Sequence, residues 1–138
     1  MSIPETSLEY LRTAARAADD KKAENIVAID VSQALAIVDS FLIASAPNER
    51  QVASIVDAIE EELQEKHDLK PLRREGRAEG RWVLLDFGDV VVHVQHDEER
   101  AFYALERLWG DSPAIDVQLP APGRPDAAGS ADDAARAV

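Results

Sequence analysis

Apolar and polar residues alternate most sharply over residues 81–111, and the pattern predicts a β-hairpin followed by a helix. Gly88-Asp89 is typical of a two-residue hairpin loop, which would pair Phe87 with Val90. In that register one face is wholly apolar and belongs to the core: Val83, Leu85, Phe87, Val90, Val92 and Val94. The opposite, mixed face carries Trp82, Leu84, Asp86, Val91, His93 and Gln95. A face that only had to be soluble would not carry a tryptophan and a leucine, so another element or a partner should cover this face.

The first part of the chain predicts a helix and two strands. A capping-box pattern at residues 6–9 opens a helix that should run to about Lys22. Its apolar stripe would be Leu8, Leu11, Ala15 and Ala18. β-branched and apolar runs at residues 25–31 and 40–45 indicate strands. The second run is apolar on both faces, which favours the middle of a sheet.

A second helix should follow, with Asn48 as its cap and Gln51 at the capping-box partner position. Its buried stripe would be Val52, Ile55, Val56, Ile59 and Leu63. Residues 69–74 are expected to form a further strand before the hairpin.

We expect Asp97 to cap the last helix and the core to receive its residues Ala101, Phe102, Leu105 and Leu108. Tyr103 and Trp109 lie on other sides of that helix, so at least one of them should extend the mixed face. Residues 112–138 are rich in Pro, Gly and Ala and have no periodic apolar face, which predicts a disordered tail. The order of elements indicates a single α/β (α+β) domain over residues 1–111, with a mixed sheet and flanking helices.

Composition narrows the possible functions. The chain has 138 residues and no cysteine, which excludes disulfides, thiolate metal sites and cysteine catalysis. The formal net charge is −12, so contact with bare nucleic acid is disfavoured and a basic protein partner, including one within a ribonucleoprotein, suits the chain better. The net acidity could also serve solubility alone, and that alternative stays open.

The one local basic cluster comprises Lys70, Arg73, Arg74, Arg77 and Arg81. With no leader pattern and no run of about 20 apolar residues, the protein is expected to be cytoplasmic, with no membrane contact.

The histidines and aspartates of the hairpin give little support for a metal site or for catalysis. His93 and His96 are three apart on a strand and would point to opposite faces, which disfavours a shared metal. We therefore expect His93 to be a hydrogen-bonded sheet residue or an interface contact. Asp86 and Asp89 flank a turn and do not project together, so Asp89 is expected to be a turn residue, while Asp86 is equally suited to a basic group of a partner. A small nucleotidyltransferase-like enzyme that uses sheet-edge carboxylates remains the alternative to a binding protein.

Several blocks of this sequence resemble one family. The blocks are Trp82–Asp86, Gly88–His93, Glu99-Arg100, Phe102-Tyr103 and Leu105–Trp109, together with Asp39, Phe41 and residues 50–52 upstream. They resemble the signature of the bacterial and organellar ribosomal silencing factors, the Iojap-like family, over roughly residues 7–111. The chain departs from that signature at Ser40, at the Ser45–Asn48 turn and at Gln95.

The resemblance implies a translational repressor, not an enzyme, with no cofactor and a nucleotidyltransferase-like scaffold. Such proteins bind the large ribosomal subunit through its L14-type protein and sterically block joining of the small subunit when nutrients are scarce. The partner-binding residues expected here are Trp82, Leu84, Asp86, Val91 and His93, with Arg100, Tyr103 and Trp109 in second place. Homodimerisation through the same mixed face is the other use that the resemblance allows.

Overall fold

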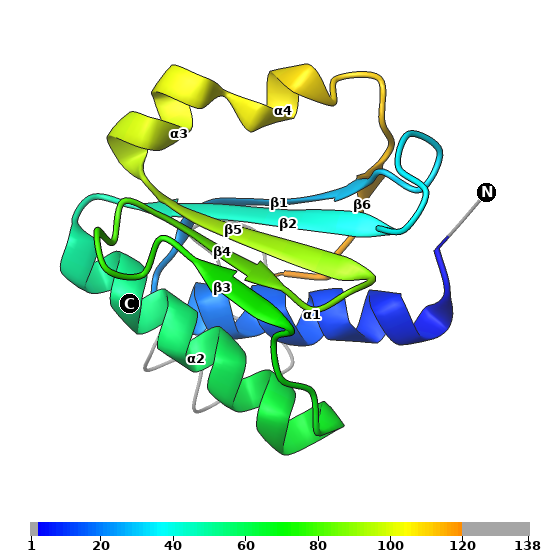
Figure 1. The fold of residues 1–138 in the computed structure, drawn as a ribbon, viewed down its shortest axis with the longest axis horizontal. Helices are drawn as coiled ribbons and strands as arrows, with labels where there is room; N and C mark the ends of the chain where they lie inside the picture. The colour runs from blue at the N-terminus through cyan, green and yellow to red at the C-terminus, as the bar shows by residue number, and fades with distance from the viewer. Residues whose placement is uncertain (1–2, 120–138) are drawn as a thin grey trace.

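In the part of the chain that the structure describes, six strands form one mixed sheet in the order β3-β4-β5-β2-β1-β6 (Figure 1). The computed structural model describes residues 3–119. The strands are β1 (Glu24–Asp30), β2 (Ser40–Ala46), β3 (Arg73–Glu75), β4 (Trp82–Asp86), β5 (Val90–His96) and β6 (Ala114–Ile115). Only β2 and β5 run parallel; all other neighbours are antiparallel. The predicted α/β (α+β) class with a mixed sheet is confirmed, and so is the central place of β2.

Helices cover the two faces of the sheet unequally. The long helices α1 (Glu5–Asp20) and α2 (Glu49–His67) lie together on one face, and the short α3 (Asp97–Tyr103) and α4 (Leu105–Leu108) lie across the other (Figure 1). Within the described residues no helix is long and apolar enough to cross a membrane. Because α3 and α4 are much shorter than α1 and α2, they cover less of their face of the sheet.

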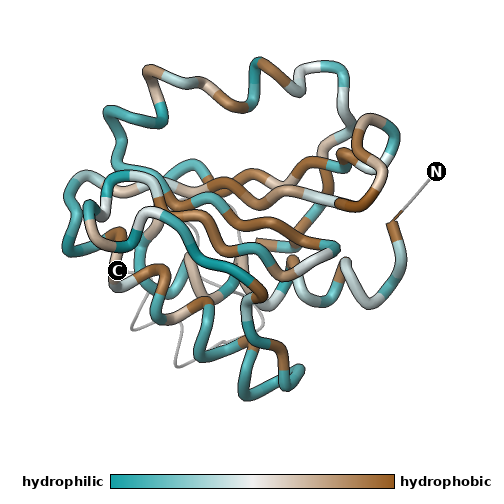
Figure 2. The backbone as a smooth tube through the Cα atoms, in the orientation of Figure 1, coloured by the Kyte–Doolittle hydropathy of each residue, from teal (hydrophilic) through white to brown (hydrophobic). Residues whose placement is uncertain are grey.

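The larger core lies between the sheet and the two long helices. All six residues of the predicted apolar hairpin face are buried there, as is the predicted stripe of α2. The α1 stripe is buried at Leu11, Ala15 and Ala18, while Leu8 is only half-buried. Hydrophobic residues are concentrated along the central strands (Figure 2). Burial of this apolar surface, at about 25 cal/mol per Å², is the main force that holds α1 and α2 on the sheet.

The β4–β5 hairpin has the predicted register. The Phe87 N–H donates to the Val90 carbonyl oxygen at 2.9 Å, and Asp86 pairs with Val91. Gly88 has φ +95°, a left-handed conformation that suits glycine. The Asp89 carbonyl oxygen accepts the N–H groups of Asp39 and Ser40, which fixes the hairpin tip to the start of β2.

The ends of the first helices differ from the predictions in part. The capping-box prediction for α1 is wrong: the helix begins at Glu5, Pro4 occupies the cap position, and no side chain caps it. Proline lacks an N–H and its fixed φ suits a helix start, so Thr6 falls inside the first turn. In α2, Asn48 Oδ1 does accept the Gln51 N–H at 2.8 Å. The Gln51 side chain instead donates to the carbonyl oxygens of residues 21 and 22, which ties α2 to the end of α1.

The predicted last helix is divided. Ala104 has φ +47°, and this left-handed residue ends α3 and starts α4 in a new direction. His96, not Asp97, caps α3, because His96 Nδ1 accepts the Glu98 N–H. Leu105 is buried as predicted, but Ala101, Phe102 and Leu108 are exposed, so those three predictions are wrong. A continuous 3.6-residue period cannot be carried through a left-handed residue, so the predicted stripe does not extend from α3 into α4. Within α3 itself, Arg100 is the buried residue, and Ala101 and Phe102 lie on its exposed side.

Two further segments are corrected by the strand bounds. The strand expected at residues 69–74 is confined to Arg73–Glu75 at the sheet edge. Ala114 and Ile115 form β6 against β1, and Val117 is buried, so the ordered chain extends beyond the domain end expected at Asp111. The rest of the expected tail, residues 120–138, lies outside the described residues.

Candidate partner-binding surface

The mixed face of the hairpin forms rows that continue across the sheet. Leu84 lies opposite His93, and His93 lies beside Ile43 on β2. In the next row Asp86 lies opposite Val91. The side chains of one row therefore reach from the edge of the sheet to its centre on the face that carries α3 and α4.

Exposure divides this face into two parts. Val91, His93 and Gln95 on β5 are buried. Trp82, Leu84 and Asp86 on β4 are only half-buried and form what we call the β4 strip. Of the five residues expected first as partner contacts, the structure thus leaves three accessible. Val91 and His93 can influence binding only indirectly, through the residues that cover them.

Tyr103 and Phe102 extend the β4 strip from the end of α3. The ring centroids of Trp82 and Tyr103 are 4.8 Å apart, and Tyr103 meets Phe102 edge-on at 4.9 Å. Tyr103 is 48% exposed and Phe102 80%. The prediction that one aromatic residue of the last helix extends the mixed face is confirmed for Tyr103. Phe102 was missed, although two consecutive aromatic residues on one helix cannot both enter a narrow seam.

His93 lies beneath Trp82. The indole N–H of Trp82 donates to His93 Nδ1 at 3.1 Å, and the imidazole meets Phe41 edge-on at 5.0 Å. His93 is only 6% exposed, and burial lowers its pKa from 6.5 to about 4. His93 Nε2 is buried without a hydrogen-bond partner among the described residues. The imidazole is therefore neutral near pH 7 and is a hydrogen-bonded sheet residue, one of the two roles expected for it.

Trp109 belongs to the smaller core. It contacts Phe41 edge-on at 5.4 Å and packs against a cluster formed by Ile29, Val31, Ile43 and Leu105. It is separated from the β4 strip by Phe41 and His93. Trp109 therefore helps to hold α4 on the sheet. A partner that contacts Trp109 would also have to contact α4.

Arg100 is an internal anchor. It is 7% exposed, and its guanidinium donates to Glu106 Oε2 at 2.9 Å, to Ser45 Oγ at 3.1 Å and to the Asn25 carbonyl oxygen at 2.7 Å. These bonds join α3 to α4 and to strands β1 and β2. The interpretation of Arg100 as a partner contact is therefore not supported by its position, because its donors are directed into the domain.

The two hairpin aspartates have separate surroundings. Asp86 Oδ1 accepts the Gly88 N–H at 2.8 Å, and its other oxygen lies 3.6 Å from the Arg73 guanidinium. Asp89 is exposed at the turn. Among residues 3–119 no group of three or more His, Asp or Glu side chains is arranged to hold a metal ion. Asp86 therefore stabilises the turn with one oxygen and pairs with Arg73 through the other, and a basic group of a partner would have to share that second oxygen.

The four arginines of the basic cluster are paired with carboxylates of the domain. Arg74 forms a bidentate pair with Glu60, and Arg77 pairs with Asp57. Arg81 contacts Glu49, Glu98 and Glu99, and hydrogen bonds to Glu99 and then Glu98 raise its pKa above the usual range. These ion pairs join β3 and the segment between β3 and β4 to α2 and α3, so the arginines do not make a free basic patch for nucleic acid.

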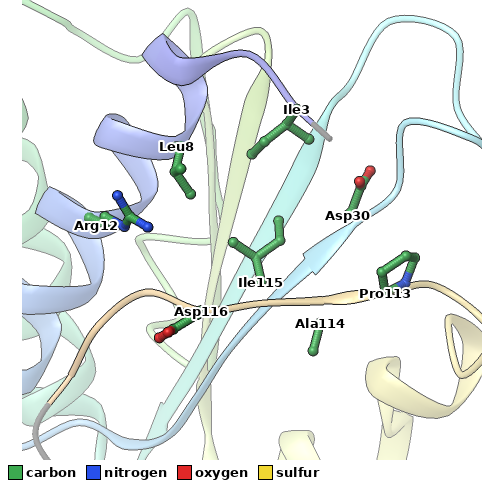
Figure 3. Close-up of a pocket in the computed structure, with 8 residues that line it drawn as sticks. All are labelled: Ile3, Leu8, Arg12, Asp30, Pro113, Ala114, Ile115 and Asp116. Carbon is green, nitrogen blue, oxygen red and sulfur yellow. The ribbon is translucent and has the colours of Figure 1, made fainter. Parts of the chain in front are cut away.

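A separate cleft lies at the other end of the sheet. Its volume is about 470 Å³, and it is lined by Ile3, Leu8, Arg12, Asp30, Pro113, Ala114, Ile115 and Asp116. Arg12 and Asp30 stand at its two ends with Ile115 between them (Figure 3). The cleft adjoins β6, whereas the β4 strip lies next to β3 at the opposite edge, so the two features are independent.

Comparison with known proteins agrees with the motifs and the fold. A family model described as "Ribosomal silencing factor during starvation" matches residues 4–137. The chain belongs to this family. The ribosomal silencing factor RsfS of Halalkalibacterium halodurans is 46% identical over 110 residues, covering 80% of this chain and 93% of the relative. The chloroplastic protein Iojap of Arabidopsis thaliana is 32% identical over 120 residues, covering 83% of this chain and 46% of the relative.

Solved structures give the same assignment. A crystal structure of a Bacillus halodurans protein matches with TM-score 0.68 and 44% identity, covering 78% of this chain and 97% of that one. A Chromobacterium violaceum protein matches with TM-score 0.71 and 28% identity, covering 86% and 96%. The expected membership of the ribosomal silencing family is thus confirmed, and with it a role in translation regulation.

Proposed function

We propose that this protein represses translation by binding the L14-type protein of the large ribosomal subunit through the β4 strip, Tyr103 and Phe102. The bound protein then excludes the small subunit under nutrient limitation. The observation that carries the proposal is the accessible group of Trp82, Leu84 and Tyr103 in a chain of the ribosomal silencing family. Large aromatic residues commonly dominate binding energy, because they remove much surface from water at a small entropy cost.

Charge supports a basic protein as the partner. The net charge is −12, and the described arginines of the basic cluster are already paired with carboxylates. Glu75 on β3 lies opposite Leu84, and Asp86 ends the strip, so two carboxylates share the single cation of Arg73 there. Ribosomal proteins are embedded in phosphate-rich surroundings and are commonly basic, so a negative module should approach them faster than it approaches bare RNA.

The mechanism needs no chemical step. A protein of this size that occupies an intersubunit contact prevents the small subunit from reaching the same surface. The effect then depends on affinity and concentration alone. The enzyme alternative gains no specific support, because Asp86 is held in the turn, Asp89 is exposed, and the described residues contain no cluster of carboxylates that could hold a metal ion.

The test is sedimentation of purified ribosomal subunits with this protein while Mg²⁺ is raised to promote joining. We expect co-migration with the large subunit and less joined ribosome. Trp82→Ala should weaken binding by about 30-fold, the effect of losing one hot-spot residue. Trp82→Phe should retain more of the binding, and Ile37→Ala, which changes an exposed apolar residue in the segment between β1 and β2, should bind normally.

Failure to sediment with the large subunit at low salt would contradict the proposal. The same strip could instead join two copies of the chain, which light scattering at increasing concentration would reveal as a mass that doubles. If Trp82→Ala abolished a dimer and left subunit binding unchanged, the strip would be assigned to homodimerisation.

A further inference from the structure

We infer that His93 is a positioning residue that makes Trp82 an apolar anchor, by accepting its indole N–H and turning the ring outward without its donor. This inference rests on the proposed function, because it concerns how the β4 strip meets its partner. The N–H to Nδ1 distance is 3.1 Å, and His93 and Trp82 belong to the neighbouring strands β5 and β4. It assigns a role in recognition to a residue that no partner can reach.

The donor of Trp82 is used up inside the domain. A tryptophan side chain has one hydrogen-bond donor and no acceptor. Because His93 Nδ1 accepts that donor, the imidazole must carry its own proton on Nε2. Trp82 can then offer a partner only the face and edge of its ring.

His93 is itself held in place. Its ring is packed edge-on against Phe41 at 5.0 Å, and its strand position lies between Leu84 of β4 and Ile43 of β2. Tyr103 supports Trp82 from above the sheet at 4.8 Å. The indole is therefore fixed by a hydrogen bond from below and by a ring contact from the helix side, which reduces the entropy it would lose on binding.

A purely structural role would be served better by an apolar residue. His93 is 6% exposed, and its Nε2 has no partner among the described residues, which costs free energy in a buried position. Neighbouring positions on β5 are occupied by Val91, Val92 and Val94. A buried polar side chain that lowers stability in this way is typical of residues that serve function.

The inference specifies the chemistry of the partner. The surface that receives Trp82 should be apolar and should lack a hydrogen-bond acceptor directed at the indole nitrogen. Asp86, four residues further along the same face, holds one carboxylate oxygen 3.6 Å from the Arg73 guanidinium of this chain. A Lys or Arg of the partner that lies beside the apolar surface would share this carboxylate with Arg73. An L14-type partner contact without a basic group would not fit this arrangement.

The experiment compares His93→Leu with His93→Asn. These side chains have nearly the same shape, but only Asn has an acceptor, its Oδ1, in the place of Nδ1. The chain has two tryptophans, so ¹⁵N spectra should show two indole N–H signals, which Trp82→Phe and Trp109→Phe assign. We expect the Trp82 signal to keep its hydrogen-bonded shift and slow solvent exchange in His93→Asn and to lose both in His93→Leu.

Binding to the large subunit is then measured for the same two variants. We expect His93→Leu to bind about five- to tenfold more weakly than His93→Asn, although it should be the more stable of the two. Equal binding by the two variants, with the wild type bound, would overturn this inference and leave the proposed function standing. An unchanged Trp82 signal in His93→Leu would also overturn it. Absence of wild-type binding would instead contradict the proposed function, on which the inference depends.

Discussion

Trp82 and Tyr103 contact each other with ring centroids 4.8 Å apart and planes tilted by 49°, which joins the start of β4 to the end of α3. Tyr103 is the last residue of α3, and the left-handed Ala104 follows it. The chain therefore turns away immediately after placing Tyr103 over the indole. Phe102, beside it, remains exposed because the turn removes any element that would cover it.

Phe102→Ala should weaken binding to the large subunit without affecting stability. Phe102 is 80% exposed, so its truncation should change the free energy of unfolding by less than about 0.5 kcal/mol. If the partner covers the rings beside Trp82, binding should fall about tenfold. Sedimentation or interferometry measures the affinity, and urea unfolding measures the stability.

The matched control is Ile37→Ala, since Ile37 is 84% exposed and lies in the segment between β1 and β2. Both variants remove an exposed apolar side chain. An equal effect of the two on binding would show that general surface hydrophobicity, not the position of Phe102, matters.

Arg100→Met should destabilise the domain and affect binding only through that loss. The substitution keeps much of the side-chain volume but removes donors to Glu106, Ser45 and the Asn25 carbonyl oxygen. We expect the free energy of unfolding to fall by about 3 kcal/mol, as when one partner of a buried charged network is deleted. Urea denaturation checks the magnitude.

Arg107→Met serves as the comparison, because Arg107 is exposed on the adjacent α4. It should leave the midpoint of unfolding nearly unchanged. If Arg100→Met left the stability equally unchanged but weakened binding to the large subunit, Arg100 would be a direct partner contact.

The sequence was sufficient for the hairpin because two independent signals agree there. The Gly88-Asp89 loop and the alternation on either side of it permit only one register, and the structure has that register. The stripe of α2 was equally clear, because five apolar residues recur at helical spacing. Local pattern decides such elements without knowledge of what they pack against.

The candidate site could be predicted only in part, because exposure depends on contacts between distant segments. The sequence placed Trp82 and His93 on one face, but it did not show that His93 would be buried beneath Trp82 and against Phe41 while Trp82 stayed accessible. Arg100 was ambiguous for the same reason, since its partners Ser45 and Asn25 are far away in the chain. The break at Ala104 had no local signal, because alanine is a strong helix former and its left-handed conformation is imposed by the surrounding packing.

Gly76→Ala should be much more harmful than Gly88→Ala. Both glycines have positive φ, +86° and +95°, so alanine is strained at either position by about 1 kcal/mol. At Gly76 the added Cβ would also collide with the Trp82 carbonyl oxygen, which is backbone and cannot move without shifting β4. At Gly88 it would make an ordinary 3.6 Å contact with Leu72.

We therefore expect a loss in the free energy of unfolding of about 1 kcal/mol for Gly88→Ala and of more than about 2 kcal/mol for Gly76→Ala. Because the collision is at Trp82, Gly76→Ala should also disturb the Trp82 indole signal. Equal losses in the two variants would mean that strain in φ, and not the close approach to β4, limits residue 76.

The buried imidazole of His93 should make the domain less stable in mild acid. Its pKa is about 4 in the folded protein and about 6.5 when unfolded. Above pH 6.5 neither state binds the proton, so His93 has no effect on the pH dependence. Between about pH 6.5 and pH 4 the unfolded chain binds it first, and stability falls as the pH falls. The total loss should be about 3 kcal/mol, complete only below the folded pKa.

Urea unfolding of the wild type and of His93→Leu at pH 7 and pH 4.5 isolates this contribution. Carboxylates such as Asp86 titrate in both proteins, so their contribution cancels when the two pH differences are subtracted. On acidification the free energy of unfolding should fall further in the wild type than in the variant. The difference should be most of the about 3 kcal/mol expected for His93. Parallel losses in the two proteins would show that the His93 pKa is not depressed, and that the imidazole is reached by water or by a proton acceptor when the domain is folded.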